Sequence, residues 1–180
     1  TLDTSKLRAM LVGLVYCPGS INWRPFRGLK PEAFEADLQI NFINLVKVIQ
    51  AVLPNLTAGE QSSIVLFSSV AASMGMPFHT SVAAAKGAIE GFAKALAAEY
   101  APKIRVNVIA PSLTDTPLAD KFLNNETKQE KSAERHPLKR FGKPEDSAQM
   151  ASFLLSDKSS WISGQIFHVD GGMSTLLVNG

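Results

Sequence analysis

Four short runs of strand-forming residues alternate with helical segments along this chain, and that alternation restricts the folds open to it. The runs are Leu11–Tyr16, Ser63–Phe67, Ile104–Ile109 and Gly164–Val169. Short runs that stay apolar favour strands buried on both faces. Strands separated by helices form βαβ units, so the sequence predicts an α/β protein with a mostly parallel sheet and helices on both faces.

The segments between these runs carry helix signals of different strength. One helix is expected from Pro31, with apolar residues at helical spacing until Pro54 interferes. A second is expected over Val82–Tyr100, which is rich in strong helix formers, and a third from Pro144 to about Ser156. The polar stretch Thr116–Arg140 suggests a mobile helical lid or loop.

Length and composition indicate one globular domain spanning residues 1–180, since 46% of the residues are hydrophobic. A net charge of +2 with no basic face argues against nucleic acid as a partner. No apolar run approaches the roughly 18 residues of a spanning helix, so no membrane partner is expected. The lone Cys17 favours a reducing compartment, by default the cytoplasm, and has no partner at metal spacing, so no metal site is expected.

Several polar residues and turns occur in an order and at spacings that can be compared with those of a known protein family. They are Asn41, Ser69, Lys86, the run Asn107-Val108-Ile109-Ala110-Pro111, Thr116 and Asp170-Gly171-Gly172. In order, spacing and flanks this set resembles the later two thirds of a short-chain dehydrogenase/reductase. The resemblance extends from Leu11 to about Met173 and implies a Rossmann-like, doubly wound parallel sheet.

The resemblance also implies a reaction and roles for these residues. In the family, hydride passes between NAD or NADP and a carbonyl or alcohol substrate. Ser69 would hold the substrate oxygen, Lys86 would bind the nicotinamide ribose and lower the pKa of a neighbouring tyrosine, and Asn41 would bend its helix and retain a water. The implied cofactor-binding residues are Gly19, Lys86, Ile109, Pro111 and Thr116.

The family's proton donor is missing from this chain. A tyrosine is expected thirteen residues after Ser69 and four before Lys86, and Val82 stands there. A valine side chain transfers no proton, so another acid must act or the chain is a catalytically inactive member that serves as a nucleotide-binding or interaction subunit. The candidate acids are His79, whose alternative is a surface loop histidine, and Tyr16, whose alternative is a partly buried aromatic.

The beginning of the chain also departs from the family pattern. No glycine-rich turn of the type that binds a pyrophosphate precedes Leu11. The resemblance makes Leu11–Tyr16 the family's fourth strand, so we expect the N-terminal strands to lie upstream of Thr1. At the end of that strand Gly19 matches the family, whereas Tyr16-Cys17-Pro18 does not.

Each site residue also has a purely structural interpretation. Ser69 would cap a strand end, Lys86 would be a solvated helix lysine, and Thr116 would be a helix N-cap before Pro117. Asn41 would hold a structural water within an apolar helix face. The segment Asp170-Gly171-Gly172 is expected to end a strand and pack a subunit contact. The apolar helices resemble those that pair between family subunits, which predicts a homodimer or homotetramer.

Overall fold

A computed structural model describes residues 7–178. Its centre is a four-stranded parallel sheet in the order β1-β2-β3-β4. The strands are β1 (Gly13–Tyr16), β2 (Ser62–Phe67), β3 (Ile104–Pro111) and β4 (Ile166–Val169). The predicted α/β class and the parallel sheet are confirmed. The N-terminal strands expected upstream of Thr1 lie outside the described residues.

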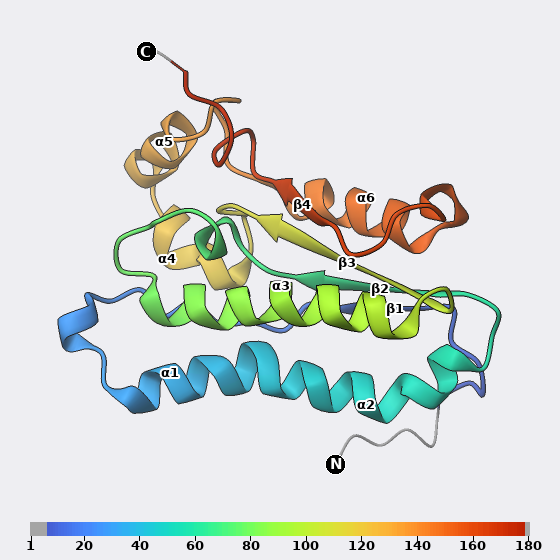
Figure 1. Ribbon diagram of the computed structural model, residues 1–180. Coiled ribbons are helices and arrows are strands. Elements are labelled where there is room, and N and C mark those ends of the chain that lie inside the picture. The colour runs from blue at the N-terminus through green and yellow to red at the C-terminus, as the bar shows by residue number, and fades with distance from the viewer. Residues whose placement is uncertain (1–6, 179–180) are drawn as a thin grey trace.

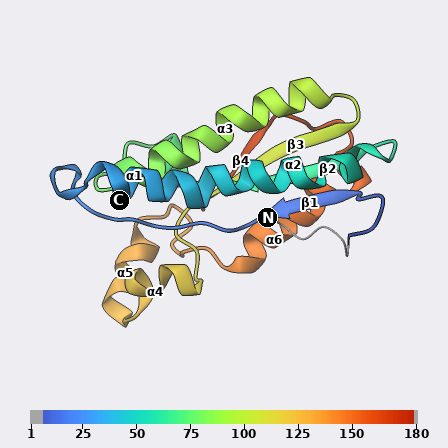
Figure 2. The same ribbon diagram turned by 90° about the horizontal axis from the view of Figure 1, so that it is seen from below.

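Helices cover both faces of the sheet. One layer holds α1 (Pro31–Leu38), α2 (Asn44–Thr57) and α3 (Thr80–Tyr100), with α1 running alongside α3 (Figures 1 and 2). The opposite face is covered by α6 (Pro144–Leu155) (Figure 1). Two short helices, α4 (Asp120–Leu123) and α5 (Glu126–Glu134), lie beyond the carboxyl ends of the strands (Figure 1).

Side chains of the central strands alternate between two cores. Ile64 and Leu66 of β2 pack with α2 and α3, whereas Val65 between them packs with Leu154 of α6. Because successive side chains of a strand point to opposite faces, a strand that is apolar throughout must be covered on both sides. This explains why the central runs of the sequence do not alternate between apolar and polar residues.

The long helix expected from Pro31 has two features that the sequence did not predict. Around Asn41 it widens into a π-helical turn over Gln39–Ile43, closed by a bond from Asn44 N to Gln39 O. Pro54 does not end the helix, which continues to Thr57. A proline removes one backbone bond within a helix, and burial of Val52 and Leu56 on either side of it supplies packing that holds the last turn.

The membrane expectation also needs a correction. The continuous helical segment Pro31–Thr57 is long and apolar enough, by length and composition alone, to cross a membrane. The expectation missed it because the apolar residues are distributed over several turns and do not form one run. In the fold, Leu45, Ile49 and Leu56 from this segment are buried against the sheet, and 28% of the apolar window as a whole is buried.

Arg105 is a buried cation that links β3 to the end of α6. Its guanidinium donates to the carbonyl oxygens of Leu154, Ser156 and Ile162 at 3.1–3.3 Å. It also donates to Ser159 Oγ at 3.0 Å. The last carbonyls of a helix have no partner within the helix, so a cation placed there satisfies them and complements the helix dipole.

Replacing Arg105 should therefore destabilise the fold strongly. Arg105→Met keeps the apolar stem but removes four hydrogen bonds made by a buried cation, and we expect the free energy of unfolding to fall by about 2–3 kcal/mol. Urea unfolding followed by circular dichroism measures this. Arg135→Met, at an exposed position, is the matched control. Equal losses in the two variants would contradict the assignment.

Candidate functional site

The carboxyl ends of neighbouring strands bring the predicted residues to one edge of the sheet. Tyr16 at the end of β1 pairs with Leu66, and Phe67 at the end of β2 pairs with Ile109. The segments that follow these strands therefore emerge side by side. In open α/β sheets ligands bind in the crevice outside these carboxyl ends.

Lys86 reaches this edge from α3. Its ammonium donates to the carbonyl oxygen of Phe67 at 3.0 Å, two residues before Ser69, and the residue is 8% exposed. Burial lowers the pKa of Lys86 from 10.5 to about 8, and the nearby Cys17 acts in the opposite direction when it is ionised. Lys86 is therefore a buried amine that exchanges its proton near neutral pH, and not a solvated helix lysine.

Asn41 lies in the π-helical turn and is fully buried. Its amide nitrogen donates to the carbonyl oxygen of Asp37 at 2.8 Å and to Ser20 Oγ at 2.9 Å. Its amide oxygen accepts from the backbone N–H of Ser20 at 3.2 Å. All of these bonds fix the amide in one orientation, which satisfies the expectation that a buried amide must be bonded.

Gly19 brings the backbone close to both Asn41 and Lys86. A Cβ at this position would stand 3.2 Å from Asn41 Oδ1 and 3.3 Å from Lys86 Nζ. The two polar atoms thus approach the same point from different helices. A glycine here leaves space between the amide oxygen and the ammonium, which a side chain would fill.

Ser69 and Val82 occupy the other two positions of the serine, tyrosine and lysine set that the sequence predicted. Ser69 is extended, and its Oγ accepts from Ala71 N at 3.2 Å, so the hydroxyl proton remains able to donate to another group. This bond caps the 3-10 turn Val70–Ala72 and not the strand end, which was the structural alternative. Val82, one helical turn before Lys86, is 4% exposed and presents only methyl groups.

Both alternative proton donors bond to backbone carbonyls. His79 Nδ1 lies 2.7 Å from the carbonyl oxygen of Pro77. The hydroxyl of Tyr16 lies 3.4 Å from the carbonyl oxygen of Ile40, and burial raises its pKa above the ordinary value. In the described part of the chain neither group hydrogen-bonds Ser69 or Lys86.

The remaining predicted cofactor residues follow β3. Ile109 lies within the strand, where its carbonyl oxygen accepts from Ser68 N at 2.8 Å, and Pro111 ends the strand. Thr116 stands at the start of a short 3-10 turn, but its hydroxyl donates to the carbonyl oxygen of Thr114 at 3.3 Å and makes no cap bond. Contact of these residues with a nicotinamide remains a prediction.

The sequence interpretation missed two residues of this site. Ser20 Oγ donates to the carboxylate of Asp37 at 2.7 Å, and both residues adjoin the Asn41 amide. A signal was present, because Asp37 stands four residues before Asn41 and so shares its helix face. Ser20 gave no signal, since only the fold brings it to that face.

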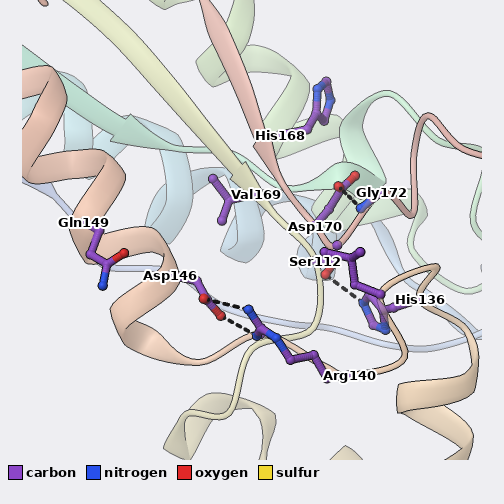
Figure 3. Close-up of a pocket in the computed structure, with 12 residues that line it drawn as sticks. Ser112, His136, Arg140, Asp146, Gln149, His168, Val169, Asp170 and Gly172 are labelled. Carbon is purple, nitrogen blue, oxygen red and sulfur yellow. Dashed lines mark hydrogen bonds and ion pairs between the residues drawn. The ribbon is translucent and has the colours of Figure 1, made fainter.

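A cavity of about 310 Å³ lies between β4, α6 and the loop after α5 (Figure 3). Here Ser112 Oγ lies 2.8 Å from His136 Nε2, and His136 Nδ1 lies 2.7 Å from the carbonyl oxygen of Ser132. A ring N–H toward that carbonyl makes Nε2 the acceptor for the serine hydroxyl. The pair ties the end of β3 to the last turn of α5.

Two carboxylates that line this cavity hold neighbouring groups in place through hydrogen bonds (Figure 3). Asp146 takes a forked bond from Arg140 at 2.7 and 2.9 Å, which holds its pKa at about 2. Asp170 follows the last residue of β4 and accepts from Gly172 N at 2.9 Å. Burial raises the pKa of Asp170, but bonds from Ser174 and Gly172 lower it more, so the net shift is downward.

Comparison with protein families agrees with this geometry. The family model described as enoyl-(acyl carrier protein) reductase matches residues 6–174. A 3-oxoacyl-[acyl-carrier-protein] reductase from Thermotoga maritima is 40% identical over 81% of this chain and 58% of its own length. An inactive 2-(S)-hydroxypropyl-CoM dehydrogenase from Xanthobacter autotrophicus is 34% identical over 92% of this chain and 74% of its own length. The chain thus spans little more than half of the first relative.

Solved structures show the same architecture. A gluconate 5-dehydrogenase from Burkholderia cenocepacia, in complex with NADP and tartrate, superposes with a TM-score of 0.89. It is 26% identical, and the match covers 97% of this chain and 68% of that chain. A short-chain type dehydrogenase/reductase from Mycobacterium ulcerans is 32% identical, with a TM-score of 0.86 over 95% of this chain and 62% of its own.

The buried amine should make stability depend on pH. The unfolded chain binds the Lys86 proton up to about pH 10.5, whereas the folded protein releases it near pH 8. The free energy of unfolding should therefore rise between these values, by at most about 3 kcal/mol from this group, and the gain is lost as pH falls through the folded pKa. Lys86→Met should remove this increment.

Urea unfolding at pH 7.0 and pH 10.0 tests the point, with Lys47→Met, at an exposed position, as the control. We expect the control to keep the pH dependence of the unaltered protein. The same pH dependence in Lys86→Met would show that the amine is not desolvated.

Proposed function

The chain belongs to the short-chain dehydrogenase/reductase family, and on that basis we propose that it is an oxidoreductase acting with NAD or NADP on a carbonyl or alcohol substrate. The single observation that carries the proposal is the convergence of Lys86, Asn41 and Gly19 at the carboxyl edge of the sheet. Ser69 follows the same strand whose Phe67 carbonyl binds Lys86.

The residues at this edge fit the nicotinamide half of such a cofactor. Gly19 leaves room where a Cβ would meet both polar atoms, and the ammonium of Lys86 can donate to a ribose hydroxyl. The hydroxyl of Thr116 makes no cap bond and can serve a carboxamide. When bound, the cofactor supplies or accepts the hydride. The NADP-bound gluconate 5-dehydrogenase supports this choice of cofactor.

We assign the proton transfer to Lys86 itself. With Val82 one turn away there is no phenol between the ammonium and the substrate oxygen, and the side chains of His79 and Tyr16 bond elsewhere. A general acid works best when its pKa lies near the working pH, and burial brings that of Lys86 to about 8. Below this pH Lys86 donates a proton during reduction, and above it the free amine accepts one during oxidation.

Restoring the phenol tests the proposal. In the full-length protein, Val82→Tyr places a hydroxyl between Ser69 and Lys86. We expect carbonyl reduction to rise by about 10²-fold or more, since a positioned general acid contributes on that order. Oxidation of NADH or NADPH with a panel of ketones, followed by absorbance, measures the rate. Ser69→Ala in the Val82→Tyr background should remove most of the gain.

Two results would reject hydride transfer. One is no absorbance change with either cofactor in both the unaltered protein and Val82→Tyr. The other is no thermal shift on adding NADH or NADPH.

A non-catalytic role is the second candidate, and the aliphatic Val82 favours it. A relative of this chain, 34% identical, is itself described as an inactive dehydrogenase. In this role the chain binds nucleotide or contributes an interaction surface without turnover. A thermal shift with NADH or NADPH combined with no turnover in the unaltered protein, but turnover in Val82→Tyr, would favour this candidate.

We also propose that the chain pairs with a second copy through α2 and α3. A groove of about 220 Å³ runs between these helices and is lined mainly by apolar side chains of both. Its lining includes Val46, Leu53 and Phe92, which are only partly buried.

We also propose that the protein is cytoplasmic. Cys17 is free and exposed, and a free thiol is consistent with a compartment that keeps thiols reduced.

Placing a charge in the groove between α2 and α3 should disrupt the pairing. Leu53→Arg places a long charged side chain among the apolar side chains of the proposed interface, and we expect the assembly to dissociate to monomer. Analytical ultracentrifugation measures the species present. Trp161→Arg, at a position that is 99% exposed, should leave the assembly intact. Sedimentation of the unaltered protein as monomer alone would contradict the proposal.

A further inference from the structure

Asp37 is the only buried side chain of α1. It is 4% exposed, although carboxylates are rarely buried without a partner. Its Oδ1 accepts from Ser20 Oγ at 2.7 Å, whereas its Oδ2 is buried and has no hydrogen-bond partner. A half-satisfied buried carboxylate requires an explanation, and its neighbours provide one.

The bonds around Asp37 lead toward Lys86. Ser20 Oγ donates to Asp37 and accepts from Asn41 Nδ2 at 2.9 Å, while Ser20 N donates to Asn41 Oδ1. That amide oxygen and Lys86 Nζ both lie within 3.3 Å of the point where a Cβ of Gly19 would stand. One continuous polar path therefore connects the carboxylate to the space beside the ammonium.

No salt bridge to Lys86 is formed within the described residues. The one ion pair among residues 7–178 joins Arg140 and Asp146, at the other cavity. Three acidic groups bear on Lys86: the Cys17 thiol after β1, whose charge acts on it directly, Glu90 one turn further along α3, and Asp37 of α1 at the far end of the polar path. Burial raises the pKa of Cys17, which favours its neutral form, and Glu90 accepts the Ser68 hydroxyl at 2.6 Å. Asp37 is the remaining acidic group.

We propose that Asp37 is a positioning residue, which orients the Asn41 amide through Ser20 and keeps Lys86 protonated by supplying a buried negative charge. Fields of buried charges act over several ångströms because the interior screens them less than water does. The inference deepens the proposed function, because an ammonium that takes the place of the phenol must hold its proton at neutral pH. A merely structural Asp37 would affect stability alone.

The test follows the protonation of Lys86 directly. In full-length protein labelled with ¹³Cε-lysine, the Lys86 signal is assigned from its loss in Lys86→Arg and titrated from pH 6 to 11. In Asp37→Asn we expect the midpoint to fall by roughly half a unit, an approximately threefold change in the proton-binding constant. Glu35→Gln, an exposed carboxylate on the same helix, is the matched control and should leave the midpoint unchanged.

A second variant covers the case in which Asp37→Asn does not fold. Ser20→Ala removes the hydroxyl that joins the carboxylate to the amide, so the midpoint should fall in the same direction. An unchanged midpoint in every folded variant of the two positions overturns the proposal. The titration needs neither NAD(P) nor turnover, so failure of hydride transfer and failure of this coupling give different results.

Discussion

The bond between the Lys86 ammonium and the Phe67 carbonyl is the contact on which the rest of the site depends. It attaches α3 to the carboxyl end of β2 and places a desolvated cation beside the segments that follow β1 and β2. An ammonium is stable there only if polar groups approach it closely. Gly19 has no side chain, so the Asn41 amide oxygen and the ammonium can approach the same point. The hydrogen bonds of Asn41 hold its amide in a fixed orientation there.

The π-helical turn is the backbone feature that carries the Asn41 amide into this site. In a regular helix Asn41 would be one more position in an otherwise apolar segment, whereas the widened turn lets its side chain bond Ser20 and the carbonyl of Asp37. Insertions of this type in helices are frequent at functional sites. Here the insertion links the helix to the segment after β1.

The aliphatic side chain of Val82 changes how this site can work. In the family the lysine acts through a tyrosine, and in this chain the same helix face presents methyl groups and then the amine. Burial makes this amine less basic than an ordinary lysine. The proposed roles of Lys86 and Asp37 follow from that one substitution.

The sequence by itself determined the alternation of strands and helices, the parallel sheet and the family, because apolar runs and the order of Ser69, Lys86 and the Asn107–Pro111 run depend on local chemistry and spacing. Only the tertiary structure decided that Pro54 is tolerated and that Ser20 meets Asp37. These features depend on contacts between segments far apart in the chain. No pattern of spacing encodes such contacts, because they form only when the sheet sets its neighbouring strand ends side by side.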